Sequence, residues 1–93
     1  MNDFNEIFEL ENSFNEKNDI ILSFYKNHIN SDDDEDASDI ENSYKNSFNR
    51  YVMFNDYIQS KLSDASDIVQ TMSLLIEREQ YINHILITNE LNK

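Results

Sequence analysis

The stretch SDIENSYKNSFNRYVMFNDYIQSKL, residues 38–62, decides the fold. Its apolar and aromatic side chains recur every three or four residues, at Ile40, Tyr44, Phe48, Tyr51, Phe54, Ile58 and Leu62. This interval places them on one face of an α-helix, which turns once in about 3.6 residues. Ser38 and Glu41 have the spacing of a capping box, in which each side chain accepts a backbone N–H at the helix start. We therefore predict a helix over about 38–62.

Two flanking stretches show the same period. In residues 3–29, seam positions recur every seven residues, at Ile7, Phe14, Ile21 and His28. Five polar residues at 15–19 interrupt this stretch; we predict one helix here, while a bend or a split stays open. Residues 66–91 carry the most apolar stripe, so we expect this third helix to be central, with Leu75 and Ile76 in the core.

The chain has 93 residues and contains neither Gly nor Pro, the residues that tight β-turns need. The connections at 30–37 and 63–65 are short, and short connections join antiparallel neighbours. We predict an all-α fold, an antiparallel (up-down-up) three-helix bundle in a single domain of residues 1–93, with an acidic loop at 30–37. Helices of about 35–40 Å are long and thin for a monomer of this size, so we also expect a homodimer.

The pentapeptide DASDI occurs twice, as Asp36–Ile40 and as Asp64–Ile68. Each copy lies just before a predicted helix, so Ser66 is the expected N-cap of the third helix, as Ser38 is of the second. Two interpretations stay open. The repeat is either a duplicated helical unit with a shared binding role, or a chance similarity between two N-caps followed by amphipathic helices.

The residue types argue against an enzyme and against a bound metal or cofactor. The absence of Cys removes thiolate ligands and nucleophiles, and the absence of Gly removes phosphate-cradling loops. His28 and His84 have no chelating partner at helical spacing. No nucleophile motif surrounds any Ser, and a thin bundle leaves little room for a pocket of paired carboxylates. We expect no cofactor and no catalysis.

The acidic run at 32–36 resembles the start of a calcium-binding EF-hand loop, with Asp32, Asp34 and Asp36 at its first, third and fifth positions. The resemblance ends there. Ala37 stands where the loop needs Gly, and Ser43 stands where a bidentate Glu would close the site. We interpret the run as a solvated loop and predict no metal site.

No stretch approaches the roughly 18 apolar residues that cross a bilayer, and the first six residues lack the basic region of a signal peptide. We therefore expect a cytoplasmic protein without a membrane partner. Its richness in Asn and Ser, with few Arg, suits an AT-rich genome such as that of a phage, a plasmid, a low-GC bacterium or a parasite.

The charge is unevenly distributed along the chain. Nineteen acidic residues against seven basic ones give a net charge of −12, and residues 1–41 hold thirteen of the acids but only two bases. This half would attract basic proteins and repel nucleic acid. The expected partner-binding residues are Glu6, Glu9, Glu16, Asp32, Asp33, Asp34, Glu35, Asp36 and Asp39.

In size and charge, though in no motif, the chain resembles the DNA-mimic inhibitors that phages and mobile elements use against restriction or CRISPR enzymes. The resemblance implies a small protein that presents a DNA-like carboxylate surface to a basic, nucleic-acid-binding partner. The alternative is a non-enzymatic helical adaptor, chaperone or assembly subunit that binds its partner through an apolar and aromatic stripe, with Tyr44 and Tyr57 as the contact residues.

Overall fold

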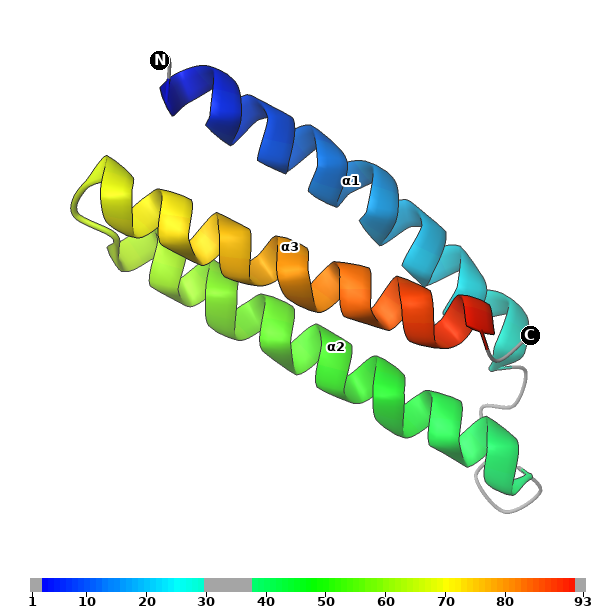
Figure 1. The fold of residues 1–93 in the computed structure, drawn as a ribbon. Helices are drawn as coiled ribbons and strands as arrows, with labels where there is room; N and C mark the ends of the chain where they lie inside the picture. The colour runs from blue at the N-terminus through cyan, green and yellow to red at the C-terminus, as the bar shows by residue number, and fades with distance from the viewer. Residues whose placement is uncertain (1–2, 30–37, 92–93) are drawn as a thin grey trace.

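The computed structural model describes residues 3–29 and 38–91, which form three α-helices (Figure 1). Helix α1 spans Asp3–His28, α2 spans Asp39–Asp64 and α3 spans Ile68–Leu91. The described residues contain no β-strand, so the predicted all-α class and the helical bundle are confirmed. The predicted acidic loop at 30–37 lies outside the described residues.

Helix α1 is continuous through the polar stretch at 15–19. Two residues of that stretch are held by the neighbouring helices. The Lys17 ammonium pairs with the Glu79 carboxylate of α3, and the Asn18 side-chain oxygen accepts a 2.5 Å hydrogen bond from the Tyr51 hydroxyl of α2. The weak apolar pattern is therefore compensated by polar contacts between helices.

The two copies of the pentapeptide start their helices in different ways. Ser38 is the N-cap of α2, and its hydroxyl accepts the Glu41 N–H at 3.1 Å, which confirms that prediction. The prediction for Ser66 is wrong. The Asp67 carboxylate accepts the Gln70 N–H at 2.8 Å instead, and α3 begins at Ile68. An Asp binds a free N–H of the first turn as well as a Ser does, so either residue can cap.

The three helices form a thin, elongated molecule of 52 × 25 × 15 Å. The chain runs along α1, returns along α2 and runs forward again along α3, which lies between the other two in Figure 1. The most extensive contact joins α1 to α3. The radius of gyration is 15.4 Å, whereas a globular chain of this length has about 12 Å. Such a shape leaves much of each helix uncovered.

The core is small and partly aromatic. The buried hydrophobic residues are Ile21, Tyr25, Tyr51, Ile58, Leu75, Ile82 and Ile85. Leu75 is 2% exposed, as predicted, but its predicted companion Ile76 is 44% exposed. Consecutive helical residues are about 100° apart, and here Leu75 faces the neighbouring helices while Ile76 is turned toward the edge of the contact. Ile40, at the start of the predicted stripe of α2, is also exposed.

Candidate protein-binding surfaces

The predicted acidic residues of α1 lie in two environments. Glu9 and Glu16 are exposed, seven residues apart and therefore on one side of the helix. Glu6 is half-buried, and together with Glu9 it lines a hollow between α1 and α3. Both residues therefore flank the contact of α1 with α3. Asp19, not among the expected binding residues, is exposed as well.

The positive charges near this face are few. Of the two bases in residues 1–41, Lys17 is paired with Glu79 and Lys26 lies in the last turn of α1. The exposed carboxylates of Glu9 and Glu16 therefore give the exposed surface of α1 a negative potential. Asp39 is exposed in the first turn of α2, where a carboxylate interacts favourably with the helix dipole. The other predicted acids, Asp32, Asp33, Asp34, Glu35 and Asp36, lie outside the described residues.

The two predicted contact tyrosines differ in accessibility. Tyr44 is half-buried, with its ring centroid 5.4 Å from that of Phe24 and 5.0 Å from that of His28. Tyr57 is 51% exposed, and the Lys61 ammonium lies 5.6 Å from its ring centroid. Tyr44 thus helps to close the end of the bundle, whereas about half of Tyr57 is exposed to solvent.

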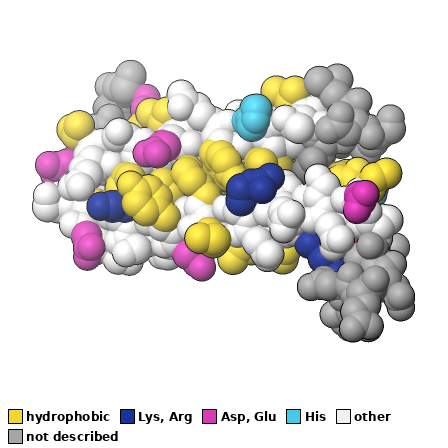
Figure 2. Space-filling view, turned by 90° about the horizontal axis from the view of Figure 1, so that it is seen from below, with side chains coloured by type: hydrophobic (Ala, Val, Ile, Leu, Met, Phe, Trp, Pro, Cys, Tyr) yellow, Lys and Arg dark blue, Asp and Glu magenta, His cyan; other side chains and the backbone are white. Residues whose placement is uncertain are grey.

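Helix α2 exposes further apolar side chains beside Tyr57. Val52 is 38% exposed and Met53 is 70% exposed. Figure 2 views the molecule from the side on which α2 lies in Figure 1, and hydrophobic side chains run along the middle of this face with cations among them. We call Val52, Met53 and Tyr57 the α2 patch. It is chemically unlike the acidic side of α1.

A buried arginine, which sequence reasoning missed, lies in the interior. Arg78 is 5% exposed, its Nη2 donates a 2.9 Å hydrogen bond to Glu11 Oε1, and its guanidinium carbon lies 3.7 Å from the Phe14 ring centroid. The arginine Nε has no hydrogen-bond partner among the described residues. One signal was present in the sequence: Arg78 lies three residues after Leu75 and four before Ile82, which places it on the apolar stripe.

Arg78 interacts electrostatically with Tyr51 and Glu79, whose pKa values are both shifted. Burial raises the pKa of Tyr51, which the hydrogen bond with Asn55 only partly offsets. Burial also acts to raise the pKa of Glu79, but hydrogen bonds from Lys17 and Ser13 outweigh it, and the pKa of this carboxyl lies below its usual value. The contacts of Ser13 and Lys17 with Glu79 join α1 to α3 and would be lost if one helix slid by a turn, so they help to fix the register.

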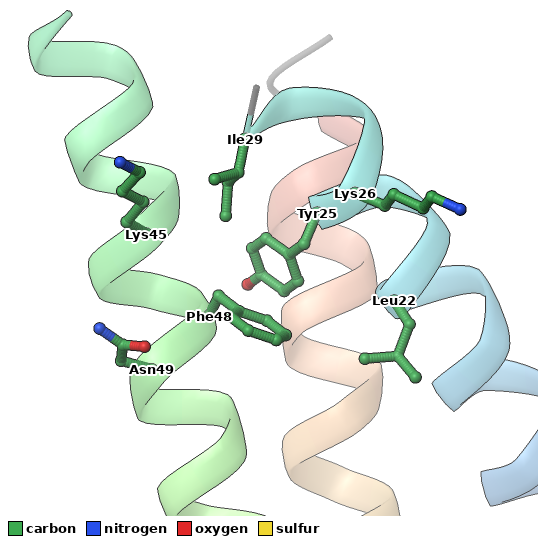
Figure 3. Close-up of a pocket in the computed structure, with 7 residues that line it drawn as sticks. All are labelled: Leu22, Tyr25, Lys26, Ile29, Lys45, Phe48 and Asn49. Atoms are coloured by element: carbon green, nitrogen blue, oxygen red, sulfur yellow. The ribbon is translucent and has the colours of Figure 1, made fainter. Parts of the chain in front are cut away.

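A hollow of about 440 Å³ lies between α1 and α2 (Figure 3). Its interior is formed by the rings of Tyr25 and Phe48 with Ile29 and Leu22, and the Lys26 side chain points away from it. The Tyr25 hydroxyl is already bonded to the Ser47 hydroxyl at 2.6 Å. The hollow therefore offers apolar surface without a converging set of polar groups.

Two adjoining hollows of about 360 and 400 Å³ follow the N-terminal half of α3. Both are lined by Met72 and Ile76, so they meet at these two side chains of α3. Val69 lies at one end, and Leu10, Glu6 and Glu9 of α1 form the opposite wall. We call these residues the α1–α3 groove. It lies where α1 diverges from α3 toward its N-terminus (Figure 1).

Within residues 3–29 and 38–91, no three His, Asp or Glu side chains are placed to hold a metal ion. In the same part of the chain, no helix is both long and apolar enough to cross a membrane. No protein-family model, no curated protein and no solved structure matches this chain. The proposals below therefore rest on its own surfaces.

Proposed function

We propose that this protein is a non-enzymatic inhibitor that binds a basic, nucleic-acid-binding protein through its acidic surface. The observation that carries the proposal is the uncompensated negative charge of α1, where Glu9 and Glu16 are exposed while Lys17 is already paired with Glu79. The acidic run at 32–36 follows this helix in the chain and adds five carboxylates. A surface of this kind attracts the Arg and Lys side chains that otherwise contact phosphates.

The inhibitor would act as an up-down-up bundle in the cytoplasm, where restriction, repair and CRISPR enzymes work. Duplex DNA carries about one phosphate per 3.4 Å of each strand, so a surface about 40 Å long would match roughly twelve phosphates. The thirteen acids of residues 1–41 are comparable in number. Since Glu11 is engaged by Arg78, the match depends on the acidic run as well as on α1.

To test this, the partner is captured on the immobilised protein and identified by mass spectrometry. Its affinity is then measured by titration at about 50 and about 300 mM salt, with and without duplex DNA. The variant Glu9→Gln/Glu16→Gln should weaken binding. The control Asp56→Asn/Glu77→Gln removes the same charge from exposed positions of α2 and α3 and should leave it unchanged. An affinity that is unchanged by salt, by duplex DNA and by both variants would contradict the proposal.

Replacing Asp32, Asp33, Asp34 and Asp36 by Asn and Glu35 by Gln tests the acidic run itself. We expect loss of binding with the helical content retained, because five adjacent like charges repel one another and contribute nothing to an apolar core. Normal binding by this variant would limit the contact surface to the helices.

A second candidate function is a helical adaptor or assembly subunit, and the α2 patch favours it. Exposed Met53 and Tyr57 supply the apolar and aromatic contacts that protein interfaces use. The same patch could join two copies in the homodimer that the elongated shape suggests. For this candidate Tyr57→Ser should abolish partner binding, whereas the charge variants of α1 should not.

A further inference from the structure

The α1–α3 groove has an apolar floor that nothing in the described structure covers. Val69 is 75% exposed and Ile76 is 44% exposed, and Met72 lies between them on the same side of α3. The spacing of three and four residues forms a continuous ridge along the helix. Leu10 of α1 faces this ridge across the groove.

The wall formed by α1 is negatively charged. Glu6 and Glu9 line the groove, and none of the described residues that line it is Lys or Arg. Glu79, at the far end, has its Oε1 bound by Lys17 and by the Ser13 hydroxyl, so Lys17 is already engaged. A ligand with cationic groups beside an apolar face would complement both the wall and the floor.

A basic segment of another protein complements this wall better than a second copy of the chain does, because a second copy brings another net charge of −12. The length of the groove fits a short helix of the bound partner. The lining residues of α3 run from Ile68 to Glu79, which corresponds to about 18 Å, or about three turns of a docked helix.

We propose that the α1–α3 groove binds a basic amphipathic helix of the partner protein. Its apolar side would pack on Leu10, Met72 and Ile76, and its Lys or Arg side chains would face Glu6 and Glu9, in the helix-in-groove mode of recognition. This inference rests on the proposed function, because it names the segment by which the basic partner is held.

The test uses a synthetic helical peptide of about 18 residues, built of Leu and Lys with Leu at positions i, i+3, i+4 and i+7, and measures its affinity by fluorescence anisotropy. A peptide of the same composition in alternating order is the control ligand. The amphipathic peptide should bind at least about tenfold more tightly, a difference of about 1.4 kcal/mol.

Two matched pairs of variants locate the site. Ile76→Ser should weaken binding about tenfold, whereas Ile87→Ser, at a 60% exposed position near the other end of α3, should not. Glu6→Gln/Glu9→Gln should weaken binding more than Glu16→Gln/Asp19→Asn, which removes the same charge outside the groove. Equal effects within both pairs would show non-specific attraction and overturn the inference.

The same variants separate this inference from the proposed function. If Ile76→Ser binds the isolated partner as tightly as wild type, and that binding still weakens with salt, the groove is not the contact while the acidic surface stays supported. If partner binding is insensitive to salt, the proposed function itself fails, whatever the peptide does. Association of the protein with itself through this groove, seen by sedimentation without peptide, would also overturn the inference.

Discussion

Arg78 carries a full positive charge into a core whose other buried residues are hydrophobic. Its ion-pair partner Glu11 has a 42% exposed side chain, while the Phe14 ring covers the guanidinium. A buried charge is costly to desolvate, and an apolar group of similar volume often replaces it without loss. We expect the free energy of unfolding of Arg78→Met to lie within about 1 kcal/mol of the wild-type value. Arg78→Ala should lower it by about 2–4 kcal/mol, because the smaller side chain leaves a cavity.

Urea unfolding monitored by far-ultraviolet circular dichroism measures both changes, and Glu11→Gln is the control that keeps the shape of the pair. Met is long enough to pack on Phe14, whereas Ala is not. Equal losses for Met and Ala would show that the charge of Arg78, rather than its packing, supports the fold.

The titration of the Glu79 carboxyl makes the stability of the fold depend on pH. Its pKa is lowered in the folded chain from the usual 4.5, because hydrogen bonds from Lys17 and Ser13 outweigh the effect of burial. The unfolded chain then binds a proton at this carboxyl more readily, so stability is full above about pH 4.5 and is lost as pH falls through the folded pKa.

We therefore expect the stability difference between wild type and Glu79→Gln to shrink between about pH 5 and pH 3. Urea midpoints measured across that interval test this. Glu77→Gln, at an exposed neighbouring position, is the charge-matched control. A wild-type advantage that persists at the lowest pH would mean that it does not come from the ionised carboxylate.

The helix starts offer a matched comparison within one repeated pentapeptide. Ser38→Ala and Asp67→Ala each remove a side chain that accepts an N–H of the first turn, so each should cost about 1 kcal/mol. Ser66→Ala should change the free energy of unfolding by less than about 0.5 kcal/mol, because α3 starts two residues later. Thermal unfolding of the three variants measures this, and a large loss for Ser66 would restore it as the cap.

Adjacent residues of α3 test where the core lies. Leu75→Ala should cost about 2–4 kcal/mol, because Leu75 is 2% exposed. Ile76→Ala should cost clearly less, because its side chain points into the open groove. Chemical unfolding separates the two, and similar losses would mean that α3 is rotated relative to its neighbours.

The helices could be predicted from the sequence more completely than the surfaces could. Periodicity and the absence of Gly and Pro were sufficient for three helices, and the Ser38–Glu41 spacing was sufficient for one cap. Periodicity alone could not decide between Leu75 and Ile76, because an apolar stripe that is wider than the core includes both. It also could not show that Arg78 faces inward, since that depends on Glu11 and Phe14 of another helix.

At the scale of the molecule, shape and charge have opposite effects on association between copies. A body only 15 Å thick covers little of its apolar surface, which favours association, and a net charge of −12 opposes association between copies. The two effects arise on different helices, because the exposed acids Glu9 and Glu16 belong to α1 and the exposed apolar residues of the α2 patch belong to α2.

Salt should therefore act in opposite directions on the two kinds of association. Pairing of two copies through the α2 patch would bury Met53 and Tyr57 against charge repulsion, so screening of that repulsion would strengthen it. Binding of a basic partner relies on attraction, so the same screening weakens it.

We expect sedimentation equilibrium to show more dimer at about 300 mM than at about 50 mM salt, while partner affinity falls over the same interval. Met53→Ser/Tyr57→Ser should abolish the dimer at both concentrations and leave partner binding intact. If the double variant loses both, one surface serves both associations, and the α2 patch rather than the acidic side of α1 holds the partner.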